Sequence, residues 1–400
     1  MNNNLKFMQI IKLKKGQDRK VNFGHPWVYS NEIETSPQLA EMASGSLVKI
    51  VNAFDNFLGI GYYNRHSLIA ARILTKKENQ EINQEFFIKK IESALKLRQD
   101  FFDEPFYRLI HSEADGLAGL IIDRFDNLLV LQIATAGMEN LLEILIAALN
   151  QVFGAPILVL RNDINVRKLE GLQEYVKVLQ GELPAENILV ENNLKFNFDP
   201  INGQKTGWFF DQRENRKFVA SLVKEKDVLD AYCYNGGFGI NAAAAGANSV
   251  TFIDSSDLAI KNVHNNIELS NLNIESCKFI NGKVFDELEN LIKVGKKFQV
   301  VVLDPPAFIK SKKDFFTGIK GYEKLAKLGA KLVAKNGYLF IASCSHNAGL
   351  QDLIRSTAEG IDKAGKSAKI VRIFGAGFDH PMHPVLLESE YLKSITYQIN

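Results

Sequence analysis

The first part of the chain alternates short apolar runs with turn residues. Ser46–Val51 and Phe57–Tyr63 alternate imperfectly between apolar and polar positions, and Asp55-Asn56 between them is typical of a turn. Leu68–Leu74 is a third run of the same kind. This pattern predicts a small β-rich module at the start of the chain.

The next part of the chain combines a polar segment, apolar residues at helical spacing and further strand-like runs. Glu78–Gln84 is polar and predicts a linker, and Phe86–Phe102 carries apolar residues near helical spacing. The elements expected after it are strands over Leu120–Arg124, Leu128–Ala134 and Ile157–Leu160 and a helix over Met138–Val152. Together these elements predict a small α+β module.

After Val190, strand-like runs alternate with helix-length segments. The runs are Asp227–Tyr232, Ser249–Asp254, Gln299–Asp304 and Gly337–Ser343. Such alternation predicts a parallel sheet with helices on both faces. A chain of 400 residues is also long enough for two or three domains. We therefore expect three: residues 1–78, 79–195 and 196–400.

The composition is that of a globular protein with no strong charge bias. Apolar residues make up 46% and charged residues 24%, which excludes a mainly disordered chain. The formal net charge is only +2, so a basic surface for nucleic acid must be local. The start, Met1–Leu13, lacks the apolar core of a secretory signal. The apolar region Leu141–Leu160 is interrupted by polar residues and a Gly-Ala-Pro turn, which predicts a short helix, a turn and a strand.

The three cysteines, Cys233, Cys277 and Cys344, are too few for a disulfide framework in a chain of this length. They indicate a reducing compartment and leave a single reactive thiol open. From these features we expect a soluble, cytoplasmic protein that neither crosses nor binds a membrane and needs no metal.

A glycine cluster follows the first strand of the predicted sheet. Asp230 lies near the end of this strand, Gly236–Gly239 lets the backbone approach a ligand, and Asp254 ends the next strand, where it can accept hydrogen bonds from a ribose. The dinucleotide fingerprint G-x-G-x-x-G is absent. A carboxylate before the loop repels a pyrophosphate but suits a cationic nucleoside, so the pattern favours S-adenosylmethionine over NAD. A glycine-rich turn without a ligand is the alternative.

Two further strand ends carry candidate chemistry. Asp304-Pro305-Pro306 forms a stiff loop, and Phe308 close behind it can lie against the face of a planar base. Cys344 follows the strand Gly337–Ser343, which we expect, together with Gln299–Asp304, to lie beside Asp227–Tyr232. A thiol at such a position is a candidate nucleophile, although a lone cysteine is more often an inert small apolar residue.

Cytosine methylation at carbon 5 needs such a thiol, because carbon 5 is a poor nucleophile until a thiolate adds to carbon 6. Asp304 would hold the base edge during this attack. Methylation of an exocyclic amine of guanine or adenine would not need Cys344. A non-catalytic RNA-binding assembly factor that kept the fold is a third hypothesis.

Basic and aromatic segments flank these motifs. Lys310, Lys312 and Lys313 follow the Asp-Pro-Pro loop, where they either bind RNA phosphates or form a solvated surface. The segment Gly203–Arg213 mixes aromatic residues with both signs of charge and can close over the amino-acid end of the cofactor. A capped helix start at Asp211 is the alternative.

These motifs together resemble the RlmI-like class I rRNA methyltransferases. The resemblance rests on four motifs in the order in which the family has them around a Rossmann-like domain: Gly-Gln-Lys-Thr-Gly-Trp-Phe-Phe-Asp-Gln-Arg, Asp-Ala-Tyr-Cys-Tyr-Asn-Gly-Gly-Phe-Gly, Leu-Asp-Pro-Pro-Ala-Phe and Ser-Cys-Ser. The Gly-His-Pro-Trp-Val-Tyr run is similar to the family's RNA-binding PUA domain. The resemblance implies a parallel sheet with an antiparallel edge, S-adenosylmethionine as cofactor, and 5-methylcytosine formation in large-subunit (23S) rRNA with Cys344 as nucleophile. It leaves homodimer formation open.

The resemblance also implies a set of site residues. Those expected at the cofactor are Asp230, Tyr232, Asn235, Gly236, Gly237, Phe238, Asp254, Ser255, Val284, Asp304, Thr206, Phe209, Asp211 and Arg213. Those expected at the RNA are Pro305, Pro306, Phe308, Lys310, Lys312 and Lys313, with Cys344 and Asp304 as the catalytic pair. The family usually has an aspartate before Val-Phe that contacts the adenine, whereas this chain has Lys283, so adenine recognition must use the backbone near Val284 or another side chain.

Overall fold

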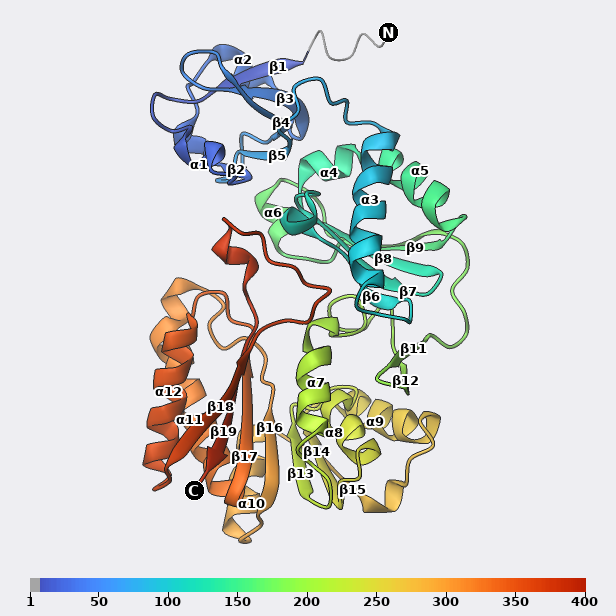
Figure 1. Ribbon diagram of the computed structural model, residues 1–400, viewed down its shortest axis with the longest axis vertical. Helices are drawn as coiled ribbons and strands as arrows, with labels where there is room; N and C mark the ends of the chain where they lie inside the picture. Colours follow the sequence, from blue (N-terminus) through green and yellow to red (C-terminus); the bar gives the residue numbers. More distant parts are fainter. Residues whose placement is uncertain (1–7) are drawn as a thin grey trace. The chain divides into compact units, whose positions relative to one another are not determined.

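The structure is a computed structural model that describes residues 8–400 (Figure 1). The expectation for Met1–Leu13 is therefore tested only from residue 8 onward, where Gln9–Lys12 forms strand β1. The chain forms two compact units. The first contains the residues up to Asn187 together with Asp199–Trp208 and Phe378–Ser389, and the second contains Ile188–Phe198, Phe209–Gly377 and Glu390–Asn400.

The N-terminal part of the first unit is a five-stranded sheet, as the β-rich pattern predicts. Its order is β1-β3-β4-β5-β2, with β1 parallel to β3 and the other pairs antiparallel. Besides β1, its elements are α1 (Arg19–Asn22), β2 (Trp27–Val28), α2 (Pro37–Glu41), β3 (Ser46–Val51), β4 (Phe57–Tyr63) and β5 (Ala71–Thr75). Asp55, in the turn between β3 and β4, has a positive φ of 63°.

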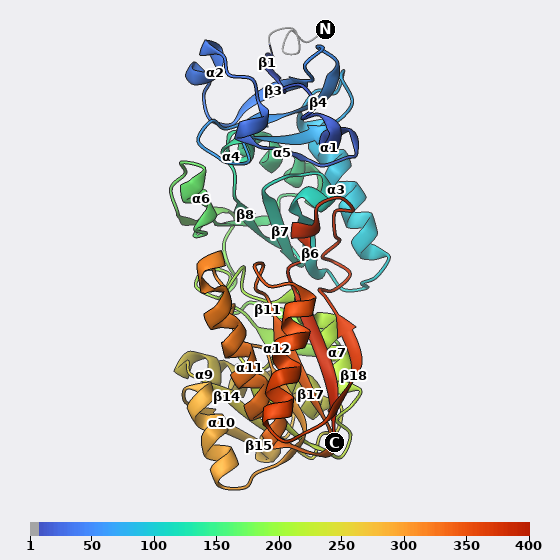
Figure 2. The same cartoon turned by 90° about the vertical axis from the view of Figure 1, so that its left-hand side faces the viewer.

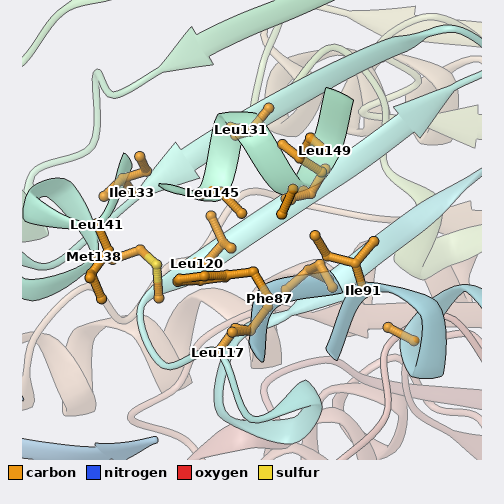
Figure 3. Packing of buried hydrophobic residues seen from close by; sticks show 14 of the residues in the cluster. Phe87, Ile91, Leu117, Leu120, Leu131, Ile133, Met138, Leu141, Leu145 and Leu149 are labelled. Atoms are coloured by element: carbon orange, nitrogen blue, oxygen red, sulfur yellow. The ribbon is translucent and has the colours of Figure 1, made fainter. Parts of the chain in front are cut away.

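The rest of the first unit is a second sheet covered by helices. Its order is β10-β9-β8-β7-β6. The elements are α3 (Gln84–Gln99), β6 (Phe106–His111), β7 (Leu120–Phe125), β8 (Leu128–Ile133), α4 (Ala136–Asn140), α5 (Leu142–Phe153), β9 (Ile157–Arg161), α6 (Val166–Leu169) and β10 (Val176–Gln180). Figure 3 shows the core between them, where Phe87 and Ile91 of α3 meet Leu145 and Leu149 of α5 over the strands. The sequence pattern did not predict β6 or β10.

The single helix expected over Met138–Val152 is wrong, because the structure has α4 and α5 with a break at Leu141. Thr135 caps α4 by accepting a hydrogen bond from the backbone N–H of Met138. The close approach of α4 to Tyr62 depends on Gly137, where a Cβ atom would lie 2.0 Å from the ring. Helix α5 packs on α3 instead. The two halves have different packing partners, and this explains the break.

The second unit is a seven-stranded mixed sheet in the order β15-β14-β13-β16-β17-β19-β18. The first five strands are parallel, and β19 and β18 form an antiparallel edge, so the predicted α/β class is confirmed. The strands are β13 (Asp227–Ala231), β14 (Ser249–Asp254), β15 (Cys277–Asn281), β16 (Phe298–Leu303), β17 (Val333–Ser343), β18 (Ala368–Phe374) and β19 (Lys393–Ile399). A separate hairpin of β11 (Ile188–Glu191) and β12 (Leu194–Asn197) belongs to the same unit.

Helices cover both faces of this sheet (Figures 1 and 2). One group is α7 (Arg213–Ala220), α8 (Gly237–Ala244) and α9 (Asp257–Leu269), and the other is α10 (Val284–Lys293), α11 (Phe315–Leu332) and α12 (Leu350–Lys363). Among residues 8–400, none of the helices has the length and apolar character needed to span a bilayer.

Candidate active site

The predicted chemistry collects at the carboxyl ends of the parallel strands of the second unit. Strand β13 pairs with β14 on one side and with β16 on the other, so the strand order reverses beside β13. Ligands of open α/β sheets bind at such a reversal. Strand β16 lies directly beside β13, as expected, but β17 is separated from β13 by β16. Cys344 therefore follows β17, next to β16, which ends just before Asp304. Two strand spacings separate β17 from β13, which contains Asp230.

Asp230 lies in β13 and is buried, with 1% of its surface exposed. Its Oδ2 accepts a hydrogen bond of 2.8 Å from the backbone N–H of Gly239, whereas its Oδ1 is buried and has no hydrogen-bond partner among residues 8–400. Burial raises the pKa of this carboxyl to about 7, and the negative charges of Asp304 and Asp254 act in the same direction. An unsatisfied buried carboxyl oxygen fits a ligand that brings a positive charge or a hydrogen-bond donor.

The loop between β13 and α8 has strained backbone. Tyr232 and Tyr234 have φ values of 63° and 47°, and Gly236 has a φ of 82°. Positive φ is costly for bulky residues and concentrates at ligand sites. The ring of Phe238 is 6% exposed and packs against Phe340 of β17, with a centroid distance of 5.1 Å. A cofactor contact from Phe238 would therefore come from its backbone.

Asp254 supports this loop from the neighbouring strand. Its Oδ2 accepts a hydrogen bond of 3.1 Å from the backbone N–H of Tyr234, and its Oδ1 accepts one of 2.9 Å from that of Ser256. Ser255 between them is exposed. Asn235 is 2% exposed, and its carbonyl oxygen accepts a hydrogen bond of 3.0 Å from the side chain of Asn266. The carboxylate of Asp254 thus lies at the end of β14 and fixes the loop that faces it.

Val284 is the first residue of α10 and is 4% exposed. The preceding Gly282 donates its backbone N–H to the carbonyl oxygen of Asp254 at 2.9 Å, so the start of α10 lies next to the end of β14. N–H groups in the first turn of a helix have no partner within that helix. The backbone of Val284 is therefore suited to the adenine contact that the sequence predicts.

Asp304 begins the loop after β16. Its Oδ1 accepts a hydrogen bond of 2.9 Å from Nε2 of Gln212. In the same loop Pro305 is buried and Pro306 is exposed. The ring of Phe308 packs on those of Tyr322 and Phe285, with centroid distances of 4.8 and 6.1 Å. These contacts give Phe308 a structural role, and its contact with a base stays a prediction. Exposed side chains then follow at Lys310, Lys312 and Lys313.

Cys344 directly follows β17 and is partly exposed, whereas Cys233 and Cys277 are buried. Burial raises the pKa of both buried thiols, which makes them poor nucleophiles. Leu303 pairs with Ile341 across β16 and β17, so Asp304 and Cys344 lie at the same end of adjacent strands. The two loops are also joined directly, because the backbone N–H of Ile309 donates to Oγ of Ser345 at 3.2 Å.

The predicted cofactor segment Gly203–Arg213 is divided between the two units. Thr206 belongs to the first unit, where it is buried and donates a hydrogen bond to Oδ2 of Asp123. Phe209 belongs to the second unit and packs edge-on against Tyr234 of the glycine loop, with a centroid distance of 5.3 Å. Asp211 accepts a hydrogen bond of 2.5 Å from the hydroxyl of Tyr391.

Arg213 lies in the same segment but is held by another acidic residue. Its Nε donates to Oε2 of Glu191 at 3.3 Å, and Arg216 pairs with the same carboxylate. All three side chains are buried. Arg213 therefore has a clear structural role, and its role at the cofactor stays a prediction.

The sequence pattern missed three polar residues at this site: Gln212, Tyr391 and Lys393. Gln212 bonds Asp304, Tyr391 bonds Asp211, and the ammonium of Lys393 donates to the carbonyl oxygen of Ser345 at 3.0 Å. Gln212 lies inside a motif that the sequence analysis singled out. The only sequence signal for Lys393 is a cation at the start of a run that alternates polar and apolar residues.

Comparison with known proteins defines the class. Residues 114–367 match the family described as S-adenosylmethionine-dependent methyltransferase, and residues 11–76 match the PUA-like domain. The first match covers more than half of the chain. This chain is therefore an S-adenosylmethionine-dependent methyltransferase.

The nearly full-length relatives narrow this class. Ribosomal RNA large subunit methyltransferase I of Pseudoalteromonas atlantica is 34% identical over 392 residues, covering 97% of this chain and 99% of the relative. The protein of the same name from Vibrio vulnificus is 36% identical over 401 residues with the same coverage. The chain belongs to the ribosomal RNA large subunit methyltransferase I family, and the resemblance drawn from its motifs is confirmed.

Solved structures agree on the fold. The structure of SMU.776 complexed with SAH matches with a TM-score of 0.84 at 20% identity, covering 98% of this chain and all of the other. S-adenosylmethionine is the cofactor, as predicted. The site of this chain fits it, since the unsatisfied Oδ1 of Asp230 suits a cationic ligand and the strained glycine loop lies beside it.

Proposed function

We propose that this chain transfers a methyl group to carbon 5 of a cytosine in large-subunit rRNA. The name of its relatives supports the RNA substrate. The observation that carries the choice of carbon 5 is the partly exposed thiol of Cys344, at the same strand end as Asp304. Methylation of an amine would leave this thiol without a role.

S-adenosylmethionine supplies the methyl group as an electrophile. The thiolate of Cys344 attacks carbon 6 of the cytosine, which forms an S–C bond and turns the 5,6 double bond into a nucleophilic electron pair at carbon 5. Carbon 5 uses this electron pair to form a C–C bond to the methyl group, whose bond to sulfur breaks, so that S-adenosylhomocysteine is the leaving group. Carbon 5 then loses its proton to water. The electron pair of that C–H bond restores the double bond and expels the thiolate. Asp304 holds the hydrogen-bonding edge of the base during these steps.

The cofactor residues of this proposal are those of the second unit that surround the glycine loop. Asp230 faces the positive charge, Asp254 the ribose, and the backbone of Val284 the adenine. The burial of Asp230 and the position of Asp254 at the end of β14 support the first two assignments. Phe209 supports the loop through Tyr234.

The RNA-binding part of the proposal rests on the PUA-like match and on the exposed lysines after the Asp304 loop. In our proposed division, residues 1–78 form the PUA domain, 79–195 a middle domain and 196–400 the catalytic domain. A cytoplasmic location suits a chain whose three cysteines are thiols rather than disulfides.

Replacement of the thiol tests the covalent mechanism. We expect Cys344→Ala to bind S-adenosylmethionine with unchanged affinity in calorimetry but to transfer no radiolabelled methyl group to rRNA. Cys277→Ala is the matched control, because this buried thiol lies at the start of β15, and it should keep both properties.

The same assays separate the rivals. Methyl transfer that survives Cys344→Ala, with a methylated guanine or adenine in the digested rRNA, would favour an amine methyltransferase. An intact chain that gives no heat and no saturation with S-adenosylmethionine would instead favour an assembly factor.

A further inference from the structure

Lys393 is a buried cation next to the thiol that the proposed function makes the nucleophile. It is the first residue of β19 and is 6% exposed. Strand β19 runs antiparallel to β17, and Lys393 is the register partner of Ser343. The residue on which β17 ends, directly before Cys344, therefore lies opposite Lys393.

The ammonium group is fixed on the far side of the same turn. Nζ of Lys393 donates a hydrogen bond of 3.0 Å to the carbonyl oxygen of Ser345 and one of 3.2 Å to that of Tyr391. Lys393 thus contacts the turn on both sides of Cys344, through the backbone register at Ser343 and through its ammonium at Ser345. Both acceptors are neutral carbonyl groups, so these bonds place the positive charge without cancelling it.

Two carboxylates and the thiol of Cys344 act on this ammonium group. Burial lowers the pKa of Lys393, and the groups that oppose this fall are Glu390, Cys344 and Asp352. Glu390 lies just before β19, and Asp352 lies in α12 and bonds the backbone of Gly349. Other titratable groups at this end of the sheet are Asp304, which follows the adjacent strand β16, Tyr322 beside Cys344, and His346 and Tyr391, whose rings stack.

We propose that Lys393 is a positioning residue that stabilises the thiolate of Cys344 and holds the Ser343–Ser345 turn in place. In the resting protein the thiol proton passes to solvent, and the remaining negative charge is balanced by the ammonium of Lys393. The thiolate that leaves the product at the end of the cycle returns to the same partner. This inference deepens the proposed function and depends on Cys344 as the nucleophile.

Alkylation of Cys344 tests the inference without requiring methyl transfer. Iodoacetamide reacts with thiolates, so its rate at Cys344, followed by mass spectrometry of the peptide, reports the thiolate fraction at each pH. In the unaltered protein we expect half-maximal alkylation at a pH below the value of about 8.5 that is ordinary for cysteine. A midpoint at or above that value would overturn the proposal even if every variant failed to fold.

Variants then isolate the charge. We expect Lys393→Met to raise the midpoint by about one pH unit and to slow alkylation at pH 7 about tenfold. Lys393→Arg should stay within about threefold of the unaltered protein, because it keeps the charge. The matched control is Lys369→Met, which removes an exposed cation near the opposite end of β19, where Lys369 pairs with Gln398, and should change neither value.

Binding of S-adenosylmethionine by Lys393→Met shows that the variant is folded. A folded Lys393→Met with an unchanged midpoint contradicts the proposal. If Lys393→Met shifts the midpoint but Cys344→Ala still transfers methyl groups, the charge pair is supported and the covalent mechanism is wrong. Failure of this inference and failure of the proposed function are therefore distinguishable.

Discussion

Asp230 dominates the electrostatics of the cofactor site because it combines burial with an unsatisfied oxygen. Its carboxyl is protonated in the folded chain below a pH of about 7, whereas an exposed aspartate ionises near 4. The cation of S-adenosylmethionine would stabilise the ionised form. A carboxylate before the glycine loop was evident in the sequence, but its raised pKa follows from the packing around it.

Asp230 should make the chain less stable as the pH rises. Its folded pKa lies above its unfolded pKa, so its stabilising contribution is complete below pH 4 and is lost between pH 4 and about 7. The loss is roughly 4 kcal/mol at most, since one pKa unit corresponds to about 1.4 kcal/mol. Urea unfolding from pH 5 to 8 without cofactor measures this loss. The free energy of unfolding should fall over this range in the unaltered protein, and this part of the fall should be absent in Asp230→Asn.

Asp227→Asn is the control, because Asp227 lies in the same strand but has its pKa lowered by hydrogen bonds from Ser249 and Asn248. The stabilisation that Asp227 contributes is present above pH 4 and is lost at lower pH. Between pH 5 and 8, Asp227→Asn should therefore change the free energy of unfolding by the same amount at every pH. Equal pH dependence in the unaltered protein and in Asp230→Asn would refute the raised pKa.

Helix α8 can lie close to β14 because Gly239 has no side chain where the helix faces Phe252. A Cβ atom at Gly239 would lie 2.1 Å from Cε1 of Phe252 in β14, a distance that side chains do not tolerate. The same glycine donates its N–H to Asp230. One element therefore sets both the packing of the helix and the geometry of the buried carboxyl.

We expect Gly239→Ala to lower the free energy of unfolding by about 1–3 kcal/mol, although alanine favours helix by about 1 kcal/mol. The steric clash with Phe252 outweighs the gain in propensity. Urea unfolding of Gly239→Ala, Phe252→Leu and the double variant measures the coupling, and the double variant should lose less than the sum of the two. Additive losses would show that Phe252 is not the obstacle.

At the scale of the whole molecule, the net charge of +2 cannot by itself attract RNA. The attraction must come from local groups such as the exposed lysines after the Asp304 loop. The chain also returns from the second unit to the first at Phe378–Ser389, where the backbone N–H of Arg108 donates to Asp379 at 2.9 Å. The boundaries of the three expected domains stay a prediction.

Replacement of Lys310, Lys312 and Lys313 by alanine should weaken rRNA binding at low salt and make it less dependent on salt. Each lysine that neutralises a phosphate of single-stranded RNA adds about 0.7 to the slope of log affinity against log salt, so the slope should fall by about 2. Filter binding over a salt series measures it. An unchanged slope would mean that these lysines form only a solvated surface.

The sequence by itself determined the strands that end at the site and the motifs that follow them. Apolar runs located β13, β14 and β16 to within one residue at each end, because these strands are buried over most of their length. The start of β17 was placed four residues late, where the strand carries exposed polar residues. The glycine cluster and the Asp-Pro-Pro loop are each a continuous stretch of sequence, and Cys344 directly follows an expected strand. All three were therefore evident from the sequence.

Only the tertiary structure decided which distant residues join these motifs. Lys393 reaches the Cys344 turn because β19 pairs antiparallel with β17, and Gln212 reaches Asp304 because the segment before α7 lies at the end of β16. The raised pKa of Asp230 and the break between α4 and α5 likewise arise from neighbours that are far apart along the chain. Periodicity reports local conformation and burial, whereas these contacts depend on strand order and packing, which no local pattern contains.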